Sequence, residues 1–158
     1  MQEPAEIRRT DPRELARRGL DLCRGGFWEG GLTLLGEAAA PPNIVELPGV
    51  FYAYLGYGTA RSTKQYREGL ALCEYAVRAA ICDPETYLCL ARTLLLVNKR
   101  TRALGILNRG LALVPDHPDL LALRVDLGVR RPPVVPFLSR SNPLNHWLGR
   151  ARHRSRSV

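Results

Sequence analysis

The chain lacks the features that mark secreted and membrane proteins. Residues 1–14 are charged and contain no apolar segment of the signal-peptide kind, and the longer apolar runs, such as 50–55 and 94–97, are far too short to span a bilayer. The 158 residues with 46% apolar content are typical of one folded domain of ordinary size. We therefore expect a globular cytoplasmic protein.

The chain also lacks the residue patterns of metal sites and enzymes. Its four cysteines, Cys23, Cys73, Cys82 and Cys89, form no C-x-x-C pair and have no histidine at ligand spacing, so zinc is not expected. Buried, reduced thiols are the favoured interpretation, and a Cys82–Cys89 disulfide is the alternative. No histidine or carboxylate pair has the spacing of a catalytic site, and the glycine-rich segment 26–33 has Leu32 where a phosphate-binding loop needs lysine. We expect neither an enzyme nor a cofactor.

Lysine is scarce, and acidic residues are missing from the C-terminal part of the sequence. Only Lys64 and Lys99 are lysines, and no acidic residue follows Asp126. Seven arginines lie beyond Asp126, so residues 1–126 carry only +1 of the net charge of +8. The basic character therefore belongs to the C-terminal segment, and the body of the chain does not have the charge of a nucleic-acid-binding face.

Prolines mark where helices begin. Asp11-Pro12 and Asp83-Pro84 place an N-cap aspartate before a proline at the first helical position, and Pro118 follows Asp116 and His117 as a weaker example. Pro84 and Pro118 are 34 residues apart, and Pro12 and Pro84 are 72 apart, which leaves room for one hidden repeat and four extra residues. The proline-rich segment 40–49 is the expected place for the extra residues, as an extended loop.

The apolar spacing predicts an all-α protein made of three helix pairs and a seventh, capping helix. The predicted helices are 12–24 with 28–40, 50–62 with 66–81, 84–97 with 100–113, and then 118–129. Small residues would let neighbouring helices approach closely, at Gly19, Gly56 and Ala91 in the first helices and at Gly31, Gly69 and Ala103 in the second. Bulky residues would fill the space between helices, namely Trp28, Tyr66 and Leu107. No pair can bury its apolar face alone, so the pairs are expected to stack.

The spacing within residues 84–117 resembles the tetratricopeptide repeat (TPR) family. The residues that carry the resemblance are Tyr87, Leu90, Ala91, Leu94, Ala103, Leu107, Gly110 and Pro115. The resemblance implies a right-handed TPR-type α-solenoid over residues 12–130, with an N-terminal extension at 1–11. Residues 131–158 then form a proline-rich segment, a short helix and a basic tail.

The same resemblance implies a concave groove lined by the first helix of each pair. The matching positions are Arg13, Leu20, Arg24, Tyr57, Arg61, Glu85, Leu88, Arg92 and Leu96. Arg24, Arg61 and Arg92 would form a basic line interleaved with Tyr57 and Leu88. Such a lining suits a protein or peptide partner with acidic and apolar residues. The alternative is that these arginines belong to an ordinary solvated helix face.

The sequence therefore favours a protein-binding adaptor or chaperone-like scaffold. One alternative is a chaperone similar to those of bacterial type III secretion translocators, which resemble the chain in length and in having three repeats. Another is a nucleic-acid or anionic-membrane binder that uses the arginines of 150–156. In the tail, Phe137, Leu144, Trp147 and Leu148 are expected to cover the end of the stack or, through Trp147, to contact a second copy or a partner.

Overall fold

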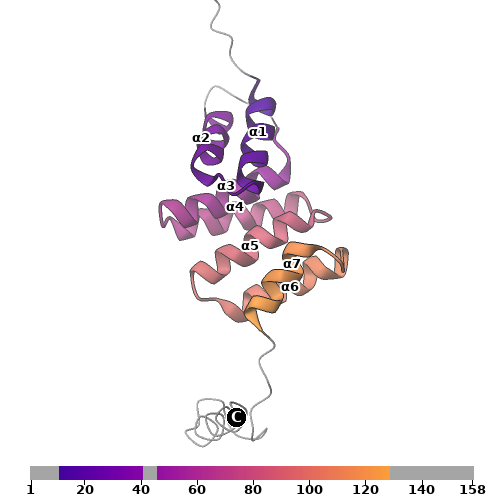
Figure 1. Cartoon of the computed structure of the whole chain (residues 1–158). Coiled ribbons are helices and arrows are strands. Elements are labelled where there is room, and N and C mark those ends of the chain that lie inside the picture. The colour runs from indigo at the N-terminus through magenta and orange to yellow at the C-terminus, as the bar shows by residue number, and fades with distance from the viewer. Residues whose placement is uncertain (1–10, 41–45, 129–158) are drawn as a thin grey trace, which may run out of the picture. The chain divides into compact units, whose positions relative to one another are not determined.

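The protein is all-helical throughout the residues that the structure, a computed structural model, describes, which are 11–40 and 46–128 (Figure 1). The described part contains seven helices and no strand, and none of these helices is long and apolar enough to cross a membrane. The helices are α1 (Pro12–Arg24), α2 (Trp28–Ala39), α3 (Gly49–Ser62), α4 (Tyr66–Ala79), α5 (Pro84–Leu96), α6 (Arg100–Leu113) and α7 (Pro118–Leu127). The all-α prediction is confirmed, and the predicted helix bounds differ from these by at most a few residues.

The caps that the sequence predicted are present at α1, α5 and α7. Asp11 Oδ1 accepts a hydrogen bond from the Arg13 amide at 3.0 Å, and Asp83 Oδ1 accepts one from the Glu85 amide at 2.9 Å. At α7 the sequence allowed either Asp116 or His117 as the capping residue. The cap is His117, because its Nδ1 accepts a hydrogen bond from the Leu120 amide at 3.4 Å. A side-chain acceptor therefore satisfies one free N–H group at the start of each of these three helices.

The helices pack as successive antiparallel pairs, as expected for a helical-repeat solenoid. The chain divides into two units, 1–126 and 127–158, and the packing described here is that of the first. Within each pair, α1 packs on α2, α3 on α4 and α5 on α6. Between pairs, each first helix contacts the first helix of the next pair, and each second helix also contacts that next first helix. The three predicted pairs are confirmed.

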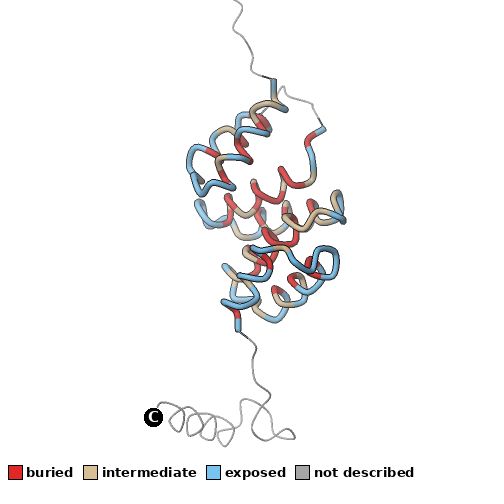
Figure 2. The backbone as a smooth tube through the Cα atoms, turned by 45° about the vertical axis from the view of Figure 1, so that its right-hand side comes forward, coloured by how far each residue is buried: buried red, intermediate tan, exposed pale blue. Residues whose placement is uncertain are grey.

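The contacts between pairs are uneven. The α5 helix packs extensively on both α3 and α4, whereas α3 meets α1 and α2 through a much smaller contact. The core is accordingly centred on α3 and α5, where Phe51, Leu88, Cys89 and Leu94 are completely or almost completely buried. Figure 2 shows that the buried stretches of the chain lie where the helices face one another. The first helix pair therefore depends on a few side chains for its attachment to the second.

Small residues permit close backbone contact within the pairs. A methyl group added at Gly56 would lie 2.6 Å from the Gly69 carbonyl oxygen, and one added at Gly19 would lie 3.1 Å from the Gly31 carbonyl oxygen. Ala91 and Ala103 are fully buried. Of the bulky residues expected between helices, Leu107 is fully buried, whereas Trp28 and Tyr66 are only partly buried.

The cysteine prediction needs two corrections. All four thiols are free, so the alternative of a Cys82–Cys89 disulfide is wrong. Cys23, Cys73 and Cys89 are buried as expected, but Cys82 is exposed. Cys82 lies in the short connection between α4 and α5, just before the Asp83 cap.

We predict opposite effects for two glycine-to-alanine substitutions. Gly56→Ala should lower the free energy of unfolding by about 1–3 kcal/mol, because the new methyl group would overlap the α4 backbone. Gly105→Ala in α6 is the matched control, because nothing lies within 4 Å of the added methyl group. It should raise that free energy by roughly 0.5–1 kcal/mol through helix propensity. Urea unfolding followed by circular dichroism measures both, and equal effects would contradict the close helix contact.

Candidate functional site

Three arginines and three aromatic rings form one cluster on the first helices and the start of α2. Arg24 lies over the Tyr54 ring, Arg61 over the Trp28 ring and Arg92 over the Tyr57 ring, with 5.8, 5.4 and 5.9 Å from guanidinium carbon to ring centroid. Each distance is within the range of a cation–π contact. We call these six residues the Arg–aromatic cluster. It contains all three arginines of the predicted basic line.

The rings also contact one another, and Trp28 contacts both tyrosines. Trp28 stacks on Tyr54 with centroids 5.9 Å apart and meets Tyr57 edge to face at 5.0 Å. Edge-to-face and offset-stacked geometries are the favoured ones for aromatic pairs. Trp28 therefore connects the first helix pair to α3, where the helix contacts themselves are few.

Helix geometry explains why these side chains meet. Tyr54, Tyr57 and Arg61 are spaced three and four residues apart in α3, so they share one face of that helix. Arg24 is the last residue of α1, Trp28 is the first of α2, and the tight connection between them brings both toward that face. Gly26 has a φ of 86° in this connection, a left-handed conformation that glycine adopts without steric cost.

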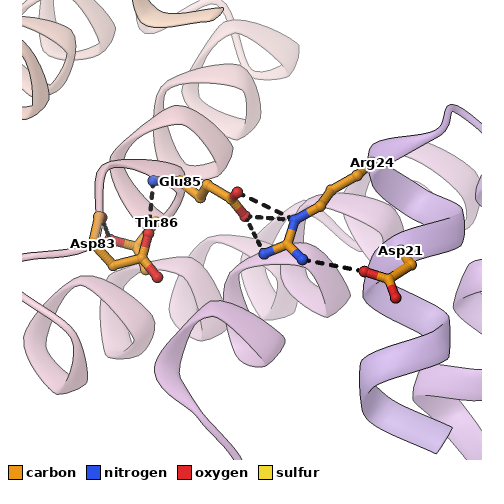
Figure 3. A network of polar contacts seen from close by, with 5 residues as sticks. All are labelled: Asp21, Arg24, Asp83, Glu85 and Thr86. Carbon is orange, nitrogen blue, oxygen red and sulfur yellow. Dashed lines mark hydrogen bonds and ion pairs between the residues drawn. The ribbon is translucent and has the colours of Figure 1, made fainter. Parts of the chain in front are cut away.

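Arg24 forms ion pairs with two carboxylates of the chain itself (Figure 3). Its Nη2 lies 2.8 Å from Glu85 Oε2, its Nε donates to both Glu85 oxygens at 3.1 and 3.2 Å, and its Nη1 lies 3.4 Å from Asp21 Oδ1. The hydrogen bonds to Glu85 are the main cause that raises the pKa of the Arg24 guanidinium. Arg24 and Glu85 are 61 residues apart, so this ion pair ties α1 directly to α5.

Glu85 is held in position by the start of α5. It is the second residue of that helix, and its amide donates to Asp83, whose backbone oxygen accepts from Thr86 Oγ1 at 2.8 Å. A carboxylate in the first turn also interacts favourably with the positive end of the helix dipole. The Glu85 side chain is only 26% exposed, which limits solvent screening of its contact with Arg24.

Arg61 and Arg92 differ from Arg24 because their charge is not balanced in the same way. Within residues 11–40 and 46–128, neither has a carboxylate oxygen within 4.0 Å. Arg61 is exposed and Arg92 is partly exposed. These two guanidinium groups are the positive charges of the cluster that no described carboxylate balances.

The other predicted groove residues divide into accessible and inaccessible ones. Leu20 and Leu88 are only 5% and 1% exposed, so both belong to the core and cannot line an open surface. Leu96 is 38% exposed, Arg13 is exposed, and Tyr57 is partly buried. Glu85 is accessible in part, but Arg24 occupies its carboxylate.

Two members of the cluster were not among the predicted groove residues. Trp28 was expected only as a space-filling residue, and Tyr54 was not predicted, although it precedes Tyr57 by three residues on the same helix face. Trp28 and Tyr54 lie between the arginines, where the prediction had placed Leu88. The predicted tail residues Phe137, Leu144, Trp147 and Leu148 lie outside the described residues.

The described residues contain no cluster of metal-binding side chains, and their three buried thiols are not activated. No group of three or more histidine, cysteine, aspartate and glutamate side chains among them could hold a metal ion. Burial raises the pKa of Cys23 to about 11 and that of Cys73 to about 12, and it also raises the pKa of Cys89. These three thiols therefore stay protonated near neutral pH, where a nucleophile would need to be a thiolate.

The Arg24–Glu85 ion pair should make a measurable contribution to stability. A double-mutant cycle of Arg24→Ala and Glu85→Ala should give a coupling free energy of about 1 kcal/mol, because the contact is forked and partly buried. The matched control is Glu14–Arg17, an exposed pair within one helix at 2.7 Å, for which we expect only about 0.3 kcal/mol. A coupling no larger than that of the control would show that the pair does not tie α1 to α5.

Thiol reactivity should separate Cys82 from the other cysteines. With an aromatic disulfide reagent at pH 8, Cys82 in the native protein should react within seconds, because it alone of the four is exposed. Cys23, Cys73 and Cys89 should react only at the rate of unfolding, and all four should react at once in denaturant. Rapid native reaction of Cys73 or Cys89 would contradict the packing of α5. The variant Cys82→Ser, which should lose the rapid phase, is the control.

Comparison with known proteins does not add a relative. No protein-family model matches the chain, and no curated protein matches it in sequence. The likeness to tetratricopeptide repeats thus rests on the residue spacing, and the helical-repeat packing is compatible with it. The functional argument accordingly starts from the geometry of the Arg–aromatic cluster.

Proposed function

We propose that this protein is a non-enzymatic scaffold or adaptor that binds a partner protein or peptide on the surface formed by α1, α3 and α5. The observation that carries the proposal is the Arg–aromatic cluster, in which residues from all three helix pairs meet on the first helices. Arginine, tyrosine and tryptophan are the residue types most enriched where binding energy concentrates in protein interfaces. The resemblance to tetratricopeptide repeats supports the same surface.

The partner would meet both charge and apolar area on this surface. Arg61 and Arg92 supply positive charge, while Tyr57 and Leu96 supply partly exposed apolar area. Charges of this kind mainly set the rate and orientation of association, and the apolar contacts supply most of the affinity. A cytoplasmic, chaperone-like role in which the scaffold holds a segment of another protein belongs to this proposal.

Partner capture should depend on Arg92. With the full chain as bait in extracts of the native cell, Arg92→Glu should reduce recovery of the main captured protein at least tenfold, because the substitution reverses one of the two unbalanced charges of the Arg–aromatic cluster. Arg109→Glu, which makes the same change on the exposed face of α6, is the matched control and should leave recovery unchanged. Mass spectrometry identifies and quantifies the captured protein, and circular dichroism confirms that both variants remain folded. Equal recovery with both variants would refute the proposed surface.

A further inference from the structure

We infer that Arg61 and Arg92 together form a binding site for two carboxylates of an acidic partner segment, and that Glu85 is an internal occupant which removes Arg24 from that site. This inference rests on the proposed function and names which arginines would bind the acidic class of partner that the sequence suggested. It also divides the three arginines of the cluster into two that bind and one that holds the fold together.

The two available arginines are connected through the rings beneath them. Arg61 lies 5.4 Å from the Trp28 centroid, Trp28 lies 5.0 Å from Tyr57, and Tyr57 lies 5.9 Å from Arg92. Both guanidinium groups therefore belong to one continuous group of side chains, within reach of a single short peptide segment. Two carboxylates of one segment can meet them together.

The rings position the arginines without occupying their hydrogen-bond donors. Apart from these ring contacts, neither guanidinium group donates a hydrogen bond to a residue in 11–40 or 46–128, so its N–H groups are free for an acceptor. Because the rings restrict the long arginine side chains in advance, less rotamer entropy is lost when a ligand binds. Trp28 and Tyr57 are thus positioning residues for Arg61 and Arg92.

The cluster already holds a carboxylate of its own. Glu85 meets Arg24 through a forked contact, in which Nε donates to Oε1 at 3.2 Å and Nη2 donates to Oε2 at 2.8 Å. This is the geometry in which arginine binds carboxylates most strongly. Arg24 also contacts Asp21, so two carboxylates balance its charge. The site that remains open therefore contains two cations, Arg61 and Arg92.

An acidic protein segment fits the site better than nucleic acid does. A polyanion gains affinity from many phosphate contacts along an extended positive surface, whereas residues 1–126 carry a net charge of only +1. Two isolated guanidinium groups instead match a small number of carboxylates. Leu96 lies four residues after Arg92, on the same face of α5, and offers 38% exposed apolar side chain beside them.

Two synthetic peptides test the ligand class on the full-length chain. One is a fluorescein-labelled 12-residue peptide with four glutamates and two leucines in a serine–glycine background, and the other has glutamine in place of each glutamate. Fluorescence anisotropy at 50 mM salt should show at least tenfold tighter binding of the glutamate peptide. Arg61→Gln and Arg92→Gln should each weaken its binding five- to tenfold, whereas Arg109→Gln should have no effect.

The variant Glu85→Gln tests the role of the internal carboxylate. It should lower the melting temperature, because the ion pair between α1 and α5 is lost. It should nevertheless bind the glutamate peptide about three- to tenfold more tightly, because Arg24 keeps only its longer contact with Asp21 and its Nε and Nη2 can then meet a third carboxylate. Glu14→Gln, which releases Arg17 outside the cluster, is the matched control and should leave the affinity unchanged. If Glu85 had only a structural role, Glu85→Gln would weaken binding or leave it unaltered.

The outcomes separate this inference from the proposed function. Equal affinity for the two peptides, no binding of either, or unchanged affinity in Arg61→Gln and Arg92→Gln would overturn the carboxylate site. The scaffold proposal would survive such a result if partner capture still depended on Arg92. An unaltered or lowered affinity in Glu85→Gln would overturn the role given to Glu85. Tighter binding of a single-stranded oligonucleotide or an anionic vesicle through Arg61 and Arg92 would overturn the partner class.

Discussion

The contact of Trp28 with Tyr54 and Tyr57 is the interaction on which the arrangement of this protein depends most. The second and third helix pairs share a large common core around α3 and α5, but the first pair meets α3 through few helix contacts. One indole ring, at the first residue of α2, contacts both tyrosines and so fixes the first pair against the rest. The Arg24–Glu85 ion pair adds a second attachment, from the end of α1 to the start of α5.

The same contacts give the surface its chemical character. Each ring of the cluster lies under one arginine, so residues that join the helix pairs also hold three positive charges on the first helices. The chain neutralises one of them with Glu85 and leaves Arg61 and Arg92 without a carboxylate among the described residues. Under the proposed function, stability and binding would therefore belong to different arginines of one cluster. Charge alone would not separate them, because all three are identical residues at related helix positions.

Local rules were enough to predict the helices, and they were not enough to predict the site. Aspartate–proline caps, the 34-residue spacing and the small residues such as Gly56 and Gly69 act within one helix or between neighbours, so the sequence reveals them. The pairing of Arg24 with Glu85 joins residues 61 positions apart and depends on how successive pairs rotate, which no local pattern encodes. For the same reason Leu88 was assigned to the surface although α5, packed on both α3 and α4, buries it. Trp28 was assigned to packing alone, because its contacts with two tyrosines of α3 and with Arg61 arise only in the folded stack.

The most direct test of the central claim is to observe the Arg–aromatic cluster in solution. Protons above an aromatic ring experience a ring-current shift, so the side-chain δ protons of Arg61 should resonate upfield of their usual position in NMR spectra of the full chain. In Trp28→Leu the Arg61 signals should return to ordinary values, while those of Arg109 stay unchanged. Arg61 signals at ordinary values in the unsubstituted protein would contradict the cluster, and with it the positioned cations from which the proposed binding surface is built.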